Sequence, residues 1–191
     1  MLNGVELRPG MILNMSSSTR FGRMVRWALA RGYRKLTGDK HARRNCPSHS
    51  AMVVEDAGAL WIGEAQAPRA GLTSLTAFQD ALDRGVYYNF RIFEPIGATT
   101  QEARAASAAW MRYVCGRPYD AIAMLRLLLK AAFGDIINSA AGVPWAFYCT
   151  EANMTAWRKG AGRDFYHNKS PTPLTEFKRF LEGYLIEIAA K

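Results

Sequence analysis

The sequence predicts an α+β fold in which helices pack on an antiparallel sheet. Short β-like runs alternate with amphipathic helix-like runs along the 191 residues. Two of the β-like runs, at 49–55 and 60–66, are separated only by a tight turn, which joins antiparallel strands. The hydrophobic content of 49% is enough for one sizeable core. We therefore expect a single domain over 1–191, with a basic insertion at 15–45 and a C-terminal loop, helix and strand at 160–191.

The remaining elements follow from periodicity, helix caps and chain breakers. Thr99 and Glu102 have the spacing of a capping box that starts a helix, and Gly116 and Pro118 stop that helix. Strands are expected at 11–15, 49–55, 60–66, 87–94 and 184–188. Helices are expected at 20–32, 74–83, 99–114, 120–132, 149–158 and 174–182, with a loop between 160 and 173.

The turn at 56–59 fixes the register of the predicted hairpin. If its two central residues form the loop, Ala51 faces Glu64 and His49 faces Gln66. Opposed residues share a face of the sheet, so all four side chains lie on one face. Glu64 then becomes a diagonal neighbour of His49, close enough to orient the imidazole. A slip of one residue would move every side chain to the other face.

Cys149 begins a helix-like segment and is the candidate nucleophile. A helix N-terminus favours negative charge, so a cysteine there is more easily converted to the reactive thiolate. A free cysteine alone is commonly a core residue, and the interpretation therefore depends on His49 and Glu64, which complete a Cys-His-Glu set. Cys46 is the rival nucleophile, but it lies before a strand, and Cys115 lies among apolar neighbours and is interpreted as structural.

The three cysteines are an odd number without paired spacing, which favours a reducing compartment and no disulfide framework. No signal-peptide pattern and no apolar stretch of membrane-spanning length is visible, so a cytoplasmic location is expected. Cys46 and His49 have a Cys-x-x-His spacing, but a zinc site would need distant partners among only three histidines. We expect no metal and no cofactor.

Positive charge is concentrated between Arg20 and Arg44. Nine Lys or Arg residues stand there against one acid, Asp39, which gives +8 of the chain's net +9. On a helix turning about 100° per residue, five of the arginines (Arg20, Arg23, Arg26, Arg31, Arg34) fall on an arc of roughly 140°. Trp27 lies among them, and the opposite side is expected to carry Phe21, Met24, Val25 and Ala28.

Such a basic amphipathic helix suits an anionic membrane surface or a phosphate backbone, nucleic acid being the weaker expectation. The alternative is a solvated face whose apolar side packs on the core. Because the segment runs directly into the His49 strand, we expect Arg23, Arg26 and Arg31 to rim a substrate cleft. Tyr119 caps the next helix or lines the cleft.

The order of these motifs resembles the circularly permuted branch of the NlpC-type papain-like fold, the YiiX-like proteins. The matching motifs run over roughly residues 5–160: the His49 strand, Gly-Glu-Ala at 63–65, Gly-Arg-Pro-Tyr-Asp at 116–120 and Tyr-Cys-Thr-Glu at 148–151. The opening 7–13 stretch also resembles that family, although Met11 stands where an aspartate is usual. In the 148–151 motif, Thr150 stands after the cysteine where a serine is common. The resemblance implies a permuted papain-like fold with Cys149 as nucleophile, His49 as base and Glu64 as the orienting group.

The expected function is that of a cysteine hydrolase that cleaves an amide or ester carbonyl through a thioester, with the backbone N–H of Cys149 as one oxyanion donor. Small-molecule, peptide and lipid substrates all stay open, as does acyl transfer in place of hydrolysis. The alternative function is that of a non-catalytic protein that uses the basic segment to bind anionic lipid or nucleic acid.

Overall fold

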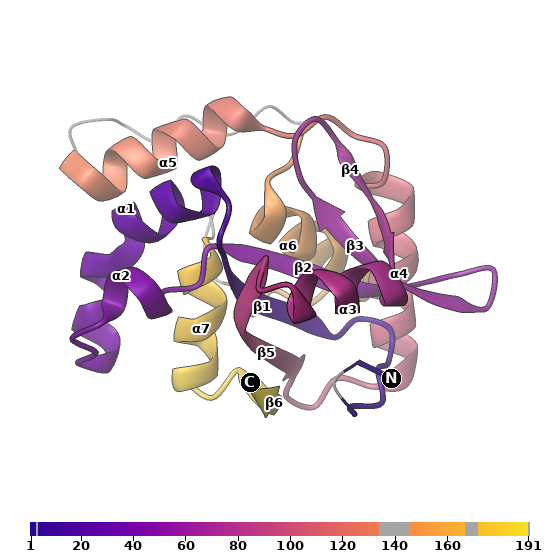
Figure 1. The fold of residues 1–191 in the computed structure, drawn as a ribbon. Coiled ribbons are helices and arrows are strands. Elements are labelled where there is room, and N and C mark those ends of the chain that lie inside the picture. The colour runs from indigo at the N-terminus through magenta and orange to yellow at the C-terminus, as the bar shows by residue number, and fades with distance from the viewer. Residues whose placement is uncertain (3, 134–145, 167–171, 191) are drawn as a thin grey trace.

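A computed structural model describes residues 1–2, 4–133, 146–166 and 172–190, and its centre is one sheet of six strands (Figure 1). Every neighbouring pair in the sheet is antiparallel, and the strand order is β4-β3-β2-β1-β5-β6. The strands are β1 (Ile12–Ser17), β2 (His49–Asp56), β3 (Ala59–Ala65), β4 (Ala70–Ser74), β5 (Tyr87–Pro95) and β6 (Leu185–Ala190).

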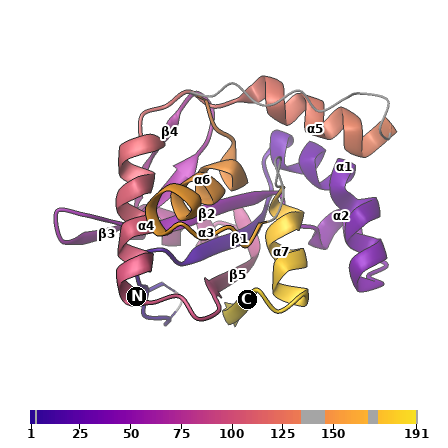
Figure 2. The same cartoon turned by 180° about the vertical axis from the view of Figure 1, so that it is seen from behind.

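Helices cover both faces of this sheet. They are α1 (Arg20–Thr37), α2 (Ala42–Asn45), α3 (Leu75–Asp83), α4 (Thr100–Tyr113), α5 (Ala121–Phe133), α6 (Cys149–Ala161) and α7 (Pro173–Leu181). Helices α4, α6 and α7 lie on the face seen in Figure 2, and α3 lies on the other, seen in Figure 1. The predicted α+β class with an antiparallel sheet is therefore confirmed.

The two faces of β1 and β2 explain why there are two cores. Ile12 and Met52 point into the core that contains α1, α4, α6 and α7. Leu13 and Val53, one position further along each strand, point into the core under α3. Alternate residues of a strand face opposite sides, so a strand segment buried on both faces has consecutive apolar residues, here Ile12 with Leu13 and Met52 with Val53.

The predicted hairpin is confirmed in its turn and in its register. Ala51 pairs with Glu64, and the turn residues Ala57 and Gly58 both have positive φ, at 48° and 78°. Two successive left-handed residues form the turn whose twist matches that of the flanking strands. The predicted pairing of His49 with Gln66 is not part of the ladder, which ends at Ala51. His49 pairs instead with Met15 of β1.

The helix predictions are confirmed in position, and the capping box is present in both directions. The Thr99 backbone N–H donates to Glu102, and the Glu102 N–H donates back to the Thr99 hydroxyl. The first helix continues to Thr37, beyond the predicted end at 32, because Gly38 provides a left-handed C-cap. Strand β4 and the short helix α2 were not predicted. Within the predicted 160–173 loop, residues 167–171 lie outside the described residues.

The end of β1 and the start of α1 lie in close contact, which positions one side of the pocket described below. A Cβ atom on Gly22 would lie 2.6 Å from the Ser17 Cβ, so only glycine fits there. Thr19 caps α1 by accepting a hydrogen bond from the Gly22 N–H at 3.0 Å. No helix among the described residues is long and apolar enough to cross a membrane.

Candidate active site

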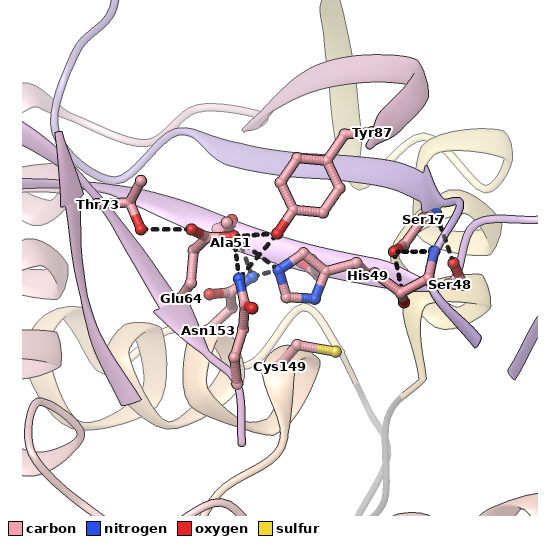
Figure 3. A network of polar contacts seen from close by, with 12 residues as sticks. Ser17, Ser48, His49, Ala51, Glu64, Thr73, Tyr87, Cys149 and Asn153 are labelled. Carbon is pink, nitrogen blue, oxygen red and sulfur yellow. Dashed lines mark hydrogen bonds and ion pairs between the residues drawn. The ribbon is translucent and has the colours of Figure 1, made fainter. Parts of the chain in front are cut away.

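The structure brings together the three residues that the sequence marks as a candidate catalytic set (Figure 3). His49 is the first residue of β2, Cys149 is the first residue of α6, and Glu64 lies near the end of β3. The His49 Nε2 atom lies 2.9 Å from the Glu64 Oε1 atom, and Cys149 lies beside the imidazole in the wall of the same pocket. All three side chains are buried.

The imidazole of His49 is under opposing influences. Burial alone would lower its pKa because a charged ring loses hydration. Hydrogen bonds and charge interactions with Cys149 and Glu64 outweigh burial and raise the pKa of His49 to about 10. Burial likewise acts to raise the pKa of Glu64, but the hydrogen bond and the charge of His49 win and lower it. The pair therefore favours an imidazolium beside a carboxylate.

Three further side chains hold the Glu64 carboxylate. The Thr73 hydroxyl donates to Oε2 at 2.6 Å, and the Tyr87 hydroxyl donates to Oε1 at 3.0 Å. The Gln66 amide donates to Oε1 at 2.7 Å and to the Tyr87 hydroxyl at 2.8 Å. Tyr87 also stacks on the His49 ring, with centroids 5.4 Å apart and planes 11° from parallel. A carboxylate held on both oxygens fixes the imidazole that it contacts.

The sequence patterns alone do not predict these supporting roles of Thr73 and Tyr87. Thr73 belongs to β4, and its pairing with Ile62 places it diagonally from Glu64 on the same face of the sheet. Only recognition of β4 as a strand could have predicted this contact. Tyr87 belongs to β5, which is separated from β2 by β1, so no local pattern connects it with Glu64.

A pocket of about 430 Å³ opens beside Cys149 and His49. Tyr119 lies in its wall, as the sequence analysis allowed, and makes an edge-to-face contact with Phe21 at 6.2 Å. The wall comes from segments that are far apart in the chain: Ser17, Thr19, Phe21, Gly22, Ser48, Ala65, Gln66, Ala67, Tyr87, Tyr119 and Ala121. Most of this lining is apolar or uncharged, so the pocket suits an uncharged or acyl group.

The structure does not place the three predicted arginines at this pocket. Arg26 is buried, and its guanidinium donates to the backbone carbonyls of Ser17 and Arg43, so it joins α1 to its surroundings. Arg31 lines a separate groove of about 620 Å³ between α1 and α2. Arg23 is exposed on α1 and is not part of the pocket wall. The predicted cleft rim is formed here by Phe21 and Gly22.

The predicted division of α1 into a basic and an apolar side also needs correction. Val25 and Ala28 are buried as expected, whereas Phe21 and Met24, expected on the same apolar side, are exposed. The buried side is centred on Gly22, Val25, Arg26, Leu29 and Tyr33. The end of β1 determines which side of the helix faces the core, and the helical period alone does not contain that information.

The other two cysteines lack comparable surroundings. Cys46 is fully buried, and burial raises the pKa of its thiol to about 12. Burial also raises the pKa of Cys115. Cys149 differs because it begins a helix of 13 residues. The preceding Tyr148 has an extended backbone, and its side chain does not cap the first-turn N–H groups. A helix start of this kind favours negative charge at Cys149.

Comparison with known proteins yields a likeness of fold. No family model and no curated protein matches the chain. Among solved structures, the crystal structure of metalloprotein yiiX (DUF1105) from Escherichia coli O157:H7 is similar, with a TM-score of 0.59 and 14% sequence identity. The match covers 98% of this chain and 99% of that one. The chain therefore has a YiiX-like fold.

That similar protein is described as a metalloprotein, so the fit of this site to a metal ion needs to be considered. Among the described residues, no group of three or more His, Cys, Asp and Glu side chains is arranged to hold a metal ion. The Nε2 atom of His49 is engaged by Glu64, and both oxygens of Glu64 accept hydrogen bonds from neutral donors. The side chains that the structure describes at this site therefore do not fit a metal ion.

Proposed function

We propose that this protein is a thiol-dependent hydrolase with a circularly permuted, NlpC-type papain-like arrangement of its site. One observation carries the proposal: a buried imidazole, oriented by the Glu64 carboxylate at 2.9 Å, lines the same pocket as a cysteine at the start of a helix. A nucleophile, a base and a group that orients the base are the components of thiol catalysis.

In this mechanism the thiol proton of Cys149 already resides on His49 in the resting site, as a thiolate–imidazolium pair, and the thiolate forms a bond to a substrate carbonyl carbon. The oxygen becomes negatively charged and accepts a hydrogen bond from the backbone N–H of Cys149 at the helix start. The imidazolium then donates its proton to the leaving amine or alcohol as the carbon–nitrogen or carbon–oxygen bond breaks. A thioester remains on Cys149.

Water resolves the thioester in the second half of the reaction. His49 accepts a proton from the attacking water, the carbon–sulfur bond breaks, and the acid is released as the thiol is restored. Glu64 stays ionised throughout and stabilises the imidazolium. An alcohol or amine in place of water would give acyl transfer. The apolar wall of the pocket, with Tyr119 in it, favours an acyl portion of the substrate at this position.

A thiol-directed activity probe tests the assignment. Cys149→Ala is expected to abolish labelling and turnover, whereas Cys46→Ala is expected to keep both, because burial holds the Cys46 thiol protonated. Both substitutions remove one sulfur from a buried position, so each controls for the packing loss of the other. Labelling that survives Cys149→Ala and disappears with Cys46→Ala would overturn the proposal.

The non-catalytic alternative is favoured by one observation, the basic groove between α1 and α2. A protein that only binds through this groove would do so independently of Cys149, and its binding would weaken steeply with salt. The pH dependence of alkylation separates the two functions. Rapid alkylation of Cys149 below about pH 7 marks an activated thiolate, and a midpoint near 8.5 marks an ordinary thiol.

A further inference from the structure

The outward side of α1 exposes large apolar side chains. Phe21, Met24 and Trp27 follow one another at three-residue spacing and are 43%, 43% and 54% exposed. Residues with this spacing lie along one side of a helix. Single exposed apolar residues are common, but a group of adjoining ones marks an interaction site.

Helix α5 extends this exposed apolar surface. It contacts α1, and the two helices lie side by side in Figures 1 and 2. Its Ile122 and Leu125 are 59% and 52% exposed. Both helices also reach the pocket, α1 through Phe21 and α5 through Ala121. The exposed apolar side chains therefore adjoin the pocket that contains Cys149.

Positive charge accompanies these apolar residues on the same helix. Four exposed arginines share the outward side of α1: Arg20, Arg23, Arg31 and Arg34. Lys40, Arg43 and Arg44 continue the positive charge into the groove between α1 and α2. The one acid of this segment, Asp39, accepts hydrogen bonds from the His41 N–H and the Asn45 amide. Arg26 is the exception, because it is buried.

We propose that α1 and α5 form a docking surface for an anionic lipid bilayer. The apolar side chains enter the interface, and the arginines contact the anionic headgroups. Docking in this way places the mouth of the pocket at the membrane, where the site takes the acyl part of a membrane-held substrate. This last step rests on the proposed hydrolase function, whereas docking itself does not.

Charge and residue type distinguish the bilayer from other occupants. A second copy of this surface would bring two segments of net charge +8 together, and like charges repel. Nucleic acid would satisfy the arginines and stack on Phe21 and Trp27. It would leave the aliphatic side chains of Met24, Ile122 and Leu125 exposed to water, because these side chains neither stack on bases nor form hydrogen bonds. A bilayer with anionic headgroups satisfies both kinds of side chain at once.

Vesicle flotation tests the docking surface, with Cys149→Ala as the parent protein so that turnover cannot alter the lipid. The parent is expected to float with vesicles of phosphatidylcholine plus phosphatidylglycerol, and much less with phosphatidylcholine alone. Met24→Gln with Trp27→Gln should reduce partitioning at least about tenfold. Arg23→Gln with Arg31→Gln should reduce it by about thirtyfold at low salt and by less at high salt.

Matched pairs elsewhere on the surface provide the controls. Ile96→Gln with Leu181→Gln removes two half-exposed apolar side chains, and Arg84→Gln with Arg112→Gln removes two exposed cations. Both control pairs should float like the parent, and thermal unfolding of every variant should match it.

Several outcomes would overturn the inference: no flotation of the parent, flotation that the α1 pairs do not change, equal binding to neutral and anionic vesicles, or tight binding to single-stranded DNA without flotation. Normal thiol labelling of the wild-type protein together with any of these results would remove the docking surface and leave the hydrolase proposal standing. Flotation as expected, together with no labelling of Cys149 in the wild-type protein, would support the docking surface and overturn the hydrolase proposal.

Discussion

At the scale of single residues, the His49 side chain shows how burial and partners compete. Its environment would favour a neutral ring if Glu64 and Cys149 were absent, and their combined influence raises its pKa to about 10. A histidine whose pKa is higher in the folded protein than in the unfolded chain stabilises the fold below its unfolded pKa. That stabilisation is lost as the pH rises through the folded value.

The raised pKa of His49 in the folded protein predicts how stability depends on pH. The difference in free energy of unfolding between the wild-type protein and His49→Gln should be largest below about pH 6.5. It should shrink as the pH rises towards 10, where the imidazole loses its proton in the folded protein as well. Urea unfolding of both proteins at several pH values measures this difference. A difference that is constant from pH 6 to 10 would contradict the raised pKa.

Tyr87 is expected to act on the reaction through Glu64. Tyr87→Phe removes the hydroxyl that donates to Oε1 at 3.0 Å and leaves the ring stacked on His49. We expect kcat to fall by about tenfold, as for other partners of an orienting carboxylate, with KM nearly unchanged. Tyr88→Phe, one position along β5, is the control and should keep wild-type kinetics. A purely structural role for Tyr87 would lower thermal stability without lowering kcat.

At the scale of elements, a second buried carboxylate joins the two elements that carry Cys149 and His49. Glu176 of α7 accepts hydrogen bonds from Ser50 at 2.6 Å and Asn153 at 3.1 Å. Ser50 follows His49 in β2, and Asn153 lies one turn after Cys149 in α6. Asn14 of β1 and Tyr166 also donate to this carboxylate. All four contacts require an acceptor on Glu176.

Glu176→Gln is expected to destabilise the protein by about 2 kcal/mol. The substitution replaces one carboxylate oxygen by an NH2 group, and a donor at the Oε2 position would face the donors of Asn14 and Ser50. Thermal unfolding measures the loss. Glu182→Gln at the C-terminal end of the same helix is the control and should change stability by less than about 0.5 kcal/mol, since Glu182 is exposed. A Glu176→Gln protein with wild-type stability would show that the buried network contributes little.

At the scale of the whole molecule, the pocket depends on segments that only the complete fold brings together. Its wall combines the end of β1, the starts of α1, α5 and α6, and the segment after β3. None of these segments could form the site alone. Substrate size should therefore be limited by residues that are distant from Cys149 in the sequence.

Ala121 offers a test of this limit, because it is small and lines the pocket at the start of α5. Ala121→Phe should raise KM for long-chain acyl substrates by about tenfold, while the rate of iodoacetamide alkylation of Cys149 stays as in the wild type. Ala108→Phe, at an exposed position of α4, is the control. Equal slowing of both reactions would mean that the larger side chain disturbs the thiol itself.

The sequence by itself determined the features that depend on neighbouring residues. The register of Ala51 against Glu64 follows from a two-residue turn and the two-residue period of strands. The start of α4 follows from the spacing of Thr99 and Glu102. The candidate set of Cys149, His49 and Glu64 came from these local patterns together with the resemblance of the motif order.

Only the tertiary structure decided the features that depend on contacts between distant segments. Strand β4 forms from a short Gly- and Thr-containing run because β3 offers a free edge, and through it Thr73 reaches Glu64. Tyr87 reaches Glu64 and His49 from another strand, β5. Arg26 is buried because the end of β1 selects the side of α1 that faces inward. Helical and strand periods specify which residues share a side, and long-range packing specifies which side meets the core.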